Sequence, residues 1–452
     1  MSAVAPPAVA APARTRPWRI LFAVMLFTSW SGNQFSPLLL LYQERQHYST
    51  AAVNGFLGVY VLGLVPAFLL SGALSDRYGR RPVMFAGVVA AIAASTVLAF
   101  GESGALMICI GRLLAGITVG TATCVGTAWM KELSQWPHDP EADTGSGARR
   151  ATLSFSLGSA VGAGVAGLFA QWGPWPEQLP FLIHVALTLP FAWLVLRAPE
   201  TATTGGVPGP LRERLRVPAA GHRRFTRVVL VAGPWVFAVS AIGYGYLPVL
   251  LAGATRGWGI AYATLLTVIA LVVSSLVQPL AKRIDAHDSA RGVLTGLALI
   301  TAAIGLVAAA DVLQSWPVGV AAAAVAGSGM GIGMTSALLE VQRIAAPTDL
   351  AGLTGVFYAV SYLGFLSPAL LAATAAVTGV PAAALLLGVV GLGVGCALLL
   401  VRSYRRHLPG RPAGGAGAVA GLRGPLARVA GGASDAGVAS AGTDADGRDA
   451  RV

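Results

Sequence analysis

The stretch that decides the fold is Gly72-Ala73-Leu74-Ser75-Asp76-Arg77-Tyr78-Gly79-Arg80-Arg81, which joins two long apolar runs. Four of its last six residues are charged, whereas the flanking runs, 51–74 and 83–101, hold no charged residue. An apolar run of about 20 residues has the length of a helix that crosses the hydrocarbon core of a bilayer. The charged stretch is therefore predicted as a tight loop, too polar to be part of a span, between two transmembrane helices.

The composition of the whole chain also indicates a membrane protein. Of its 452 residues, 55% are hydrophobic and only 11% are charged, with a mean hydropathy of +0.69. So few charges cannot cover a water-soluble domain of this size, and we expect lipid to solvate the chain. The apolar stretches predict an all-α protein with twelve spans, near 18–42, 51–74, 83–101, 104–129, 151–172, 179–197, 227–250, 260–280, 292–310, 317–342, 350–377 and 381–402.

The distribution of Lys and Arg predicts how the spans are oriented. With a cytoplasmic N-terminus, 28 of the 31 basic residues fall in inner segments and only Arg45 and Arg256 fall in outer loops. Basic residues collect on the cytoplasmic side of membrane proteins. We therefore expect a multi-pass protein of the inner (cytoplasmic) membrane with both termini in the cytoplasm. The net charge of +12 then reflects topology, and no nucleic-acid partner is expected.

The segments outside the spans predict the domain organisation. Residues 1–17 are read as a cytoplasmic arm, because the first apolar run is too long for the core of a signal peptide. Residues 198–226, rich in Thr, Gly, Pro and Arg, are typical of a linker between two six-helix bundles, 18–197 and 227–402. Residues 403–452 hold almost no large apolar side chain and are predicted to form a disordered cytoplasmic tail.

No catalytic or metal-binding pattern stands out. The three cysteines, Cys109, Cys124 and Cys396, fall within predicted spans, so no disulfide and no metal site are expected. The sequence has no phosphate-binding loop, metal-ligand cluster or nucleophile elbow. We therefore expect neither a cofactor nor an enzymatic activity.

Short internal matches indicate that the two halves are related. Gly32-x-x-Phe35-x-Pro37 in the first span returns 211 residues later as Gly243-x-x-Tyr246-x-Pro248 in the seventh. Ala115-Gly116-x-x-x-Gly120 returns at the same offset as Ala326-Gly327-x-x-x-Gly331. Such repeats are typical of transporters built from two related bundles. The charged stretch has only a decayed counterpart, at 280–283, so the first half carries the intact version.

The pattern Gly-x-Leu-Ser-Asp-Arg-x-Gly-Arg-Arg at 72–81 resembles the signature loop of the major facilitator superfamily of secondary transporters. The resemblance covers about residues 18–402 and implies two pseudo-symmetric six-helix bundles that rock about a central site. It also implies that Asp76 meets the start of the eleventh span and that Arg80 pairs with nearby acids, which latches the bundles together. Alternatively, these charges only fix the topology. The residues implied in gating are Gly72, Leu74, Asp76, Arg77, Gly79, Arg80, Arg81 and Glu132.

Two further motifs favour export. Arg112 is a charge within the fourth span, which is by default a functional hypothesis, and Arg112-x-x-x-Gly116 resembles a signature of proton-coupled antiporters. The glycines at 158–167 resemble the Gly-rich signature of drug-antiporter branches, without its Gly-Pro pair. Alternatively, Arg112 reaches the outer surface or bonds the carbonyls of a broken helix. The glycines then serve only helix packing, the set being Gly116, Gly120, Gly158, Gly162 and Gly167.

Proton coupling requires a residue within the spans that can bind and release a proton. Many exporters of this kind place an acid in the first span, but this span holds no carboxylate. Glu340, near Arg343, and His184, in the sixth span, are the candidates. Glu340 is otherwise an interfacial ion pair, and a lone histidine in a helix is more often a hydrogen-bonded packing residue.

The resemblance also implies which residues line the central cavity, because spans 1, 4, 7 and 10 surround it in this superfamily. Methionine and aromatic side chains suit an amphipathic organic substrate, although methionines also fill gaps between helices. Arg112 favours a neutral or anionic one. The implied lining residues are Asn33, Gln34, Thr118, Thr121, Tyr244, Tyr246, Met330 and Met334.

We interpret the chain as a secondary active transporter that exports a small organic compound, a drug or a metabolite, by alternating access. Its expected partners are that small-molecule substrate, protons as the coupling ion, and membrane lipid, and we expect a monomer. Import of a sugar or an organic acid is an alternative. A third reading is a ligand-binding membrane protein that does not transport, against which the intact stretch at 72–81 argues.

Overall fold

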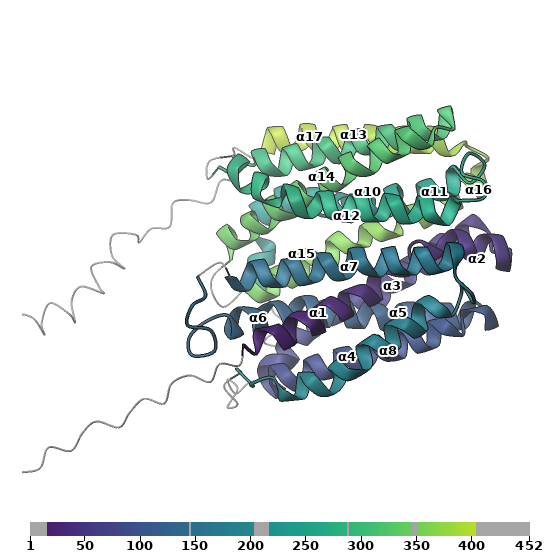
Figure 1. Ribbon diagram of the computed structural model, residues 1–452. Helices are drawn as coiled ribbons and strands as arrows, with labels where there is room; N and C mark the ends of the chain where they lie inside the picture. The colour runs from purple at the N-terminus through teal and green to yellow at the C-terminus, as the bar shows by residue number, and fades with distance from the viewer. Residues whose placement is uncertain (1–15, 144–145, 203–216, 287–288, 346–349, 404–452) are drawn as a thin grey trace, which may run out of the picture. The chain divides into compact units, whose positions relative to one another are not determined.

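The computed structural model describes residues 16–143, 146–202, 217–286, 289–345 and 350–403 (Figure 1). Most of the predicted N-terminal arm, the middle of the predicted linker and nearly all of the predicted tail lie outside these residues. The described part is helical, as the sequence predicts. Its α-helices are α1 (Trp18–Asn33), α2 (Leu38–Gln46), α3 (Thr50–Tyr78), α4 (Arg80–Ala99), α5 (Ala105–Thr121), α6 (Thr127–Leu133), α7 (Ser146–Trp172), α8 (Leu179–Leu194), α10 (Leu230–Ser240), α11 (Leu247–Leu250), α12 (Gly259–Ile284), α13 (Arg291–Leu313), α14 (Trp316–Ile344), α15 (Leu350–Tyr362), α16 (Ser367–Thr378) and α17 (Ala382–Ser403).

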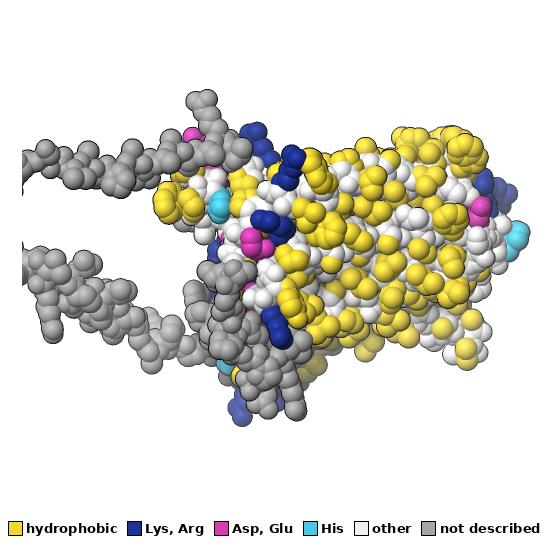
Figure 2. Space-filling model, turned by 90° about the horizontal axis from the view of Figure 1, so that it is seen from below, with side chains coloured by type: hydrophobic (Ala, Val, Ile, Leu, Met, Phe, Trp, Pro, Cys, Tyr) yellow, Lys and Arg dark blue, Asp and Glu magenta, His cyan; other side chains and the backbone are white. Residues whose placement is uncertain are grey.

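Eleven helical segments of the described chain are long and apolar enough to cross a membrane. They correspond to eleven of the twelve predicted spans, each to within a few residues. The twelfth, the first predicted span, is divided between α1 and α2. On the face shown in Figure 2, hydrophobic side chains cover the middle, and charged side chains gather toward the two ends. This distribution fits a protein whose middle is solvated by lipid.

The break in the first span has a local cause. Pro37 has no N–H, so the chain cannot continue the ladder of the α-helix through it. The Ser36 N–H donates to Asn33 O at 3.3 Å, and the Leu38 N–H donates to Phe35 O at 3.0 Å. These shorter-range bonds leave the carbonyl of Gly32 without its usual partner, the N–H of residue 36. The break therefore offers a free acceptor inside the bundle.

The related seventh span is irregular at the matching place. Between α10 and α11, residues Ala241–Tyr246 form a π-helix that ends just before Pro248. A second π-helix, Ala122–Gly126, connects α5 to α6 within the fourth span. Such π segments alter the rotation of a helix locally and occur often at functional sites.

The turn at 72–81 is much shorter than predicted. We predicted a loop too polar for a span, but α3 continues to Tyr78 and α4 begins at Arg80, so only Gly79 is non-helical. A helix satisfies its own backbone groups while its charged side chains reach water at the membrane surface, so polarity alone does not end it. Gly79 makes the reversal with φ of 102°, where any side chain is strained.

The sequence repeat is also a repeat of packing. A Cβ on Gly116 or Gly120 of α5 would collide with the carbonyl of Tyr60 or Leu64 on α3. A Cβ on the matching Gly327 or Gly331 of α14 would collide with the carbonyl of Ala270 or Ser274 on α12. The colliding carbonyls are 210 residues apart in both cases, so the two halves use the same backbone-to-backbone contact.

The two halves of the described chain meet along a few helices. α3 packs against α15 and α16, and α7 packs against α12. Between α7 and α12, Gly167 lies directly against the Thr264 side chain. The interface therefore uses the second and fifth spans of one half and the eighth and eleventh spans of the other.

Candidate functional site

The charged turn forms an ion-pair cluster at one end of the helices, which we call the basic end because Arg80, Arg150, Arg224 and Arg343 lie there. Arg80 donates to Asp76 Oδ1 at 2.6 Å and, through Nη2, to Glu132 Oε1 on α6 at 3.0 Å. The Arg80 side chain is 14% exposed, whereas those of Asp76 and Glu132 are 48% and 32% exposed. We call these three residues the Arg80 cluster; water reaches both of its carboxylates.

The contact of Asp76 with the start of the eleventh span, predicted at 350–377, stays a prediction, because residues 346–349 directly before that span lie outside the described residues. The other members of the implied gating set surround the turn. Gly72 faces the sulfur of Cys124, and a Cβ there would lie 3.2 Å from it. Leu74 and Arg81 are half-buried, and Arg77 is exposed with its guanidinium over the Tyr78 ring.

Glu200 is a further member of this region that sequence reasoning missed. Its carboxylate accepts the backbone N–H groups of Arg80 at 2.8 Å and Arg81 at 2.9 Å, at the N-terminus of α4. Partial burial opposes its ionisation, but bonds from four backbone N–H groups outweigh burial and lower the pKa of the carboxyl below its usual value. The available signal was an acid placed directly after the sixth span, on the basic end.

Arg112 lies at the break in the first span and is 1% exposed. Its Nη1 donates to Gly32 O at 3.2 Å, and its Nε donates to Phe56 O on α3 at 3.4 Å. The guanidinium carbon lies 4.6 Å from the ring centroid of Phe35 and 4.5 Å from that of Tyr60. These contacts match the alternative in which Arg112 bonds the carbonyls of a broken helix. Among the described residues, no carboxylate forms an ion pair with it.

A buried polar chain runs from the same break to His184. Gln34 Nε2 donates to Ser95 Oγ on α4 at 2.8 Å, and Ser95 Oγ lies 2.8 Å from His184 Nδ1 on α8. His184 Nε2 lies 2.9 Å from Phe27 O and 3.2 Å from Thr188 Oγ1. The three side chains that form this series of hydrogen bonds, Gln34, Ser95 and His184, are fully buried.

Glu340 belongs to a second charge cluster, at the basic end of the other half. Arg224 donates two hydrogen bonds of 2.7 Å to its carboxylate, from Nε and Nη2. Both side chains are at most 2% exposed. Arg343 donates to Glu340 Oε1 at 3.1 Å and pairs with Asp285 at the end of α12. We call these four residues the Glu340 cluster. Sequence reasoning found Arg343 as a neighbour of Glu340 but missed Arg224, which had been assigned to the linker.

The remaining residues of the expected central site come from both halves. Asn33 donates to Ser159 Oγ on α7 at 3.0 Å. In the other half, the Ser240 hydroxyl contacts the Met330 sulfur, and Tyr244 and Tyr246 on the π-helix are 2% exposed. Met334 is half-buried between two apolar clusters of the C-terminal half.

Thr118 and Thr121, which the resemblance places at the central cavity, both contact α4 in the structure. Thr118 donates to Gly87 O on α4 at 3.1 Å, and the Thr121 methyl group faces Gly87 as well. Both therefore pack inside the N-terminal half. The cause is the helical period, because the glycines of α5 turn a different face of that helix toward α3.

The glycines of the fifth span lie against helix backbones and rings. A Cβ on Gly158 would collide with Leu26 O, and one on Gly162 would lie 2.6 Å from Trp30 Cδ1, both on α1. These contacts correspond to the packing alternative for the motif.

Aromatic side chains fill the seam between the halves, and sequence reasoning missed them. The Phe68 and Tyr358 rings stack across it at 4.9 Å between centroids, and Tyr362 also stacks on Phe237 of its own half at 3.7 Å. Tyr60, which contacts Arg112, lies 6.3 Å from Tyr362 across the seam. Since aromatic residues spaced three or four apart occur in any buried helix, the sequence held no specific signal for this seam.

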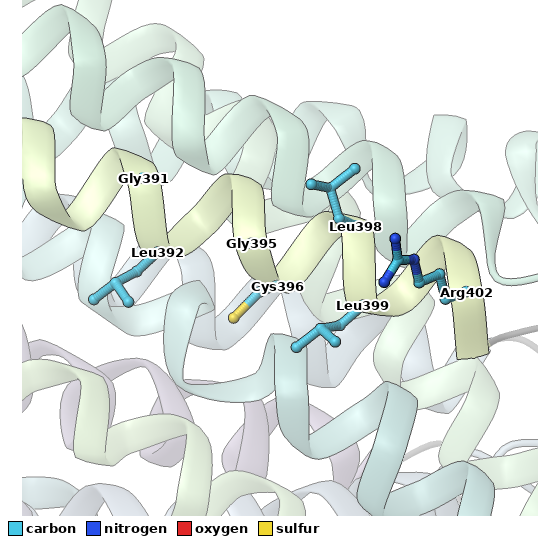
Figure 3. Close-up of a pocket in the computed structure, with 7 residues that line it drawn as sticks. All are labelled: Gly391, Leu392, Gly395, Cys396, Leu398, Leu399 and Arg402. Atoms are coloured by element: carbon cyan, nitrogen blue, oxygen red, sulfur yellow. The ribbon is translucent and has the colours of Figure 1, made fainter.

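A groove of about 440 Å³ lies on the outer side of α17, lined by Gly391, Leu392, Gly395, Cys396, Leu398, Leu399 and Arg402 (Figure 3). Every lining residue comes from this one helix, and only 17% of its most apolar stretch is buried. The groove shares no residue with either charge cluster or with the Arg112 site, so we do not place the substrate there.

Comparisons with known proteins agree with this architecture. A family model described as the Major Facilitator Superfamily matches residues 20–365. The nucleoside transporter NupG superposes with a TM-score of 0.68 at 12% identity, covering 86% of this chain and 99% of that one. The human organic anion transporter MFSD10 (TETRAN) gives 0.61 at 19% identity, covering 85% and 99%. At such identities these structures show a shared fold.

Curated relatives match shorter parts of the chain. The multidrug transporter MdfA of Escherichia coli is 30% identical over 226 residues, which are 50% of this chain and 51% of MdfA. The uncharacterized MFS-type transporter YceJ of Bacillus subtilis is 31% identical over 104 residues, 23% of this chain and 26% of YceJ. The multidrug resistance protein MdtL of Escherichia coli is 33% identical over 84 residues, 19% of this chain and 21% of MdtL. The chain thus spans about half or less of the length of each.

Proposed function

The chain belongs to the major facilitator superfamily, and we propose that it exports a small organic compound, a drug or a metabolite, in exchange for protons. We place it in the cytoplasmic membrane with its basic end and both termini in the cytoplasm, because Lys and Arg concentrate there. The relatives named as multidrug transporters support the direction and the substrate class.

The observation that carries the proposal is the Arg80 cluster. A gate has to open and close with small changes in free energy, and exposed ion pairs contribute only about 0–1 kcal/mol each. Asp76 and Glu132 are both partly exposed, so Arg80 can exchange these partners for water at low cost. The cluster therefore suits a contact that forms in one conformation and separates in the other.

Arg112 and the break in the first span are proposed to form the centre of the substrate site. Arg112 fixes two spans through backbone carbonyls, and Tyr60 links it to the aromatic seam between the halves. A planar guanidinium between aromatic rings is suited to a flat, neutral or anionic organic molecule. When the seam opens, its rings and Arg112 become available to such a molecule.

Dye accumulation in cells tests this proposal. Cells that express the protein are loaded with ethidium, fluorescein or a bisbenzimide dye, with and without a protonophore, and compared with cells that express Asp76→Asn. Lower accumulation that disappears with either change supports proton-driven export. If cells that express the protein accumulate more dye than cells without it, the protein imports the dye. If the dye binds to the protein but its accumulation does not change, the protein does not transport the dye. Either result contradicts export.

A further inference from the structure

The chain from Gln34 through Ser95 to His184 has a defined direction. The carbonyl of Phe27 can only accept, so the proton of the neutral imidazole lies on Nε2, 2.9 Å from that oxygen. Nδ1 is then an acceptor, and the Ser95 hydroxyl donates to it at 2.8 Å. Ser95 Oγ in turn accepts from the Gln34 amide. With a neutral His184, all donors point from the first span toward the histidine.

A proton on Nδ1 reverses this direction. The imidazolium has to donate to Ser95 Oγ, so the Ser95 hydroxyl needs a new acceptor. Gln34 Oε1 is buried and has no partner in the described part of the chain. A half-turn of the amide brings this oxygen to Ser95 and keeps the chain intact. The same half-turn exchanges the group that Gln34 presents on its other side, from an acceptor to a donor.

Among the described residues, the groups that contact His184 are Ser95, Phe27, Thr188 and Trp30, and all of them are uncharged. α8 packs against α4, α1, α7 and the short helix Val195–Arg197. All charged residues of these elements lie at their basic ends; Arg19, for example, precedes Phe27 by eight residues, or about 12 Å of helix. The others are Arg80, Arg81, Arg149, Arg150 and Arg197. The groups that contact the imidazole are therefore uncharged, with Trp30 beside the ring.

We propose that His184 binds the coupling proton in the N-terminal half, and that Ser95 and Gln34 transmit its protonation to the break in the first span. The inference rests on the proton coupling proposed above and names its residue. It gives the first span a proton-dependent group although that span holds no carboxylate. Because the Gln34 amide lies at the same break as Arg112, its reversal changes the hydrogen-bonding groups of the proposed substrate site.

Tryptophan fluorescence tests the proton site without any substrate. The Trp30 ring centroid lies 5.8 Å from that of His184, and a protonated imidazole quenches a neighbouring indole. The full-length protein in phosphatidylcholine–phosphatidylglycerol nanodiscs is titrated from about pH 8 to about pH 4, the range in which an imidazole gains its proton. We expect one quenching step in the wild type and none in His184→Gln or Trp30→Phe. His138→Gln, at a partly exposed histidine beyond α6, is the matched control and should keep the step.

Hydrogen exchange tests the transmission. Exchange of the backbone amides at 30–38, corrected for its intrinsic pH dependence, should change at the same pH as the quenching in the wild type. Ser95→Ala should keep the quenching step and lose the change in exchange. A wild-type protein without a quenching step overturns the proposal, and this result needs no variant to fold. Exchange that still changes in Ser95→Ala overturns the role of Ser95.

The outcomes separate this inference from the proposed function. If the quenching step is present but a proton gradient does not drive dye transport, the proton site stands and proton-driven export fails. If a proton gradient drives transport and the wild type shows no quenching step, export stands and His184 is a packing residue.

Discussion

The two charge clusters at the basic end are alike in composition and different in burial. In the Arg80 cluster, the carboxylates are 32% and 48% exposed. In the Glu340 cluster, the central pair of Arg224 and Glu340 is at most 2% exposed. Exposed pairs break at little cost, whereas a buried charge that loses its partner is strongly destabilising. From this comparison we propose that the Arg80 cluster separates during transport, as a gate does. We propose that the Glu340 cluster stays intact in all conformations and stabilises the C-terminal half; we call this role the fastening.

Glu340→Gln tests the fastening and should have the largest effect. The amide removes the negative charge that accepts two bonds of 2.7 Å from the buried Arg224 guanidinium, and breaking a buried ion pair typically costs about 3–5 kcal/mol. We expect a large fall in the melting temperature of the purified protein and little folded protein in the membrane. The matched control is Glu141→Gln, whose pair with Arg16 is 79% exposed at the glutamate and should leave stability unchanged. Equal stability of the two variants would contradict the comparison.

Arg112→Ala tests the role of a buried charge that is bonded to backbone carbonyls and not to a carboxylate, as Arg224 is bonded to Glu340. We expect transport to be lost, because both carbonyl bonds and both ring contacts disappear. Arg112→Lys should restore little, since an ammonium does not reproduce the planar donors of arginine. Transport is measured as dye efflux per folded protein. Normal efflux in the alanine variant would reduce Arg112 to a packing residue.

Asp76→Asn tests the gate. We expect slower transport with normal membrane insertion and a change in unfolding free energy below about 1 kcal/mol, as for an exposed pair. Efflux and the melting temperature are measured on the same preparation. Asp143 is also an exposed carboxylate, 61% exposed in its pair with Arg149, so Asp143→Asn serves as the control that should leave efflux unchanged. If Asp76→Asn transports dye as fast as the wild type, the assignment of the Arg80 cluster as a gate is wrong.

Glu200→Gln should have the smallest effect, and one that depends on pH. The lowered pKa of Glu200 means that its stabilising contribution is present above the usual glutamate value of about 4.3 and is lost as the pH falls through the folded-state pKa. We therefore expect the variant to melt a few degrees below the wild type at neutral pH. The two melting curves should converge below about pH 4. A gap that stays constant with pH would point to packing instead.

Much of the fold was predictable because bilayer thickness imposes the length of each span. Eleven spans agree with the prediction to within a few residues. The first span was predicted as continuous, since hydropathy does not register that Pro37 breaks the ladder. The turn at Gly79 was predicted as a longer loop, since charge was taken to exclude helix.

The candidate site was only partly predictable. Arg80 with its acids, and Arg112, stand out because charges are rare in this chain. Glu200 and Arg224 were missed, since each lies in a segment of loop-like composition and gains its role from a partner more than 100 residues away. The aromatic seam arises where two halves meet, which no local pattern encodes.

The matched glycines of α5 and α14 have a consequence for how the chain tolerates mutation. At these four positions the neighbour is a backbone carbonyl, which has no rotamer to change when a methyl group is added. If every residue of the chain is substituted in turn, Gly116, Gly120, Gly327 and Gly331 should therefore be among the positions that tolerate the fewest substitutions. The loss of folded protein should be similar at the matched positions of the two halves. The charge clusters differ between the halves, so the relation between the halves should be clearer in the positions that tolerate no substitution than in the positions of the charges.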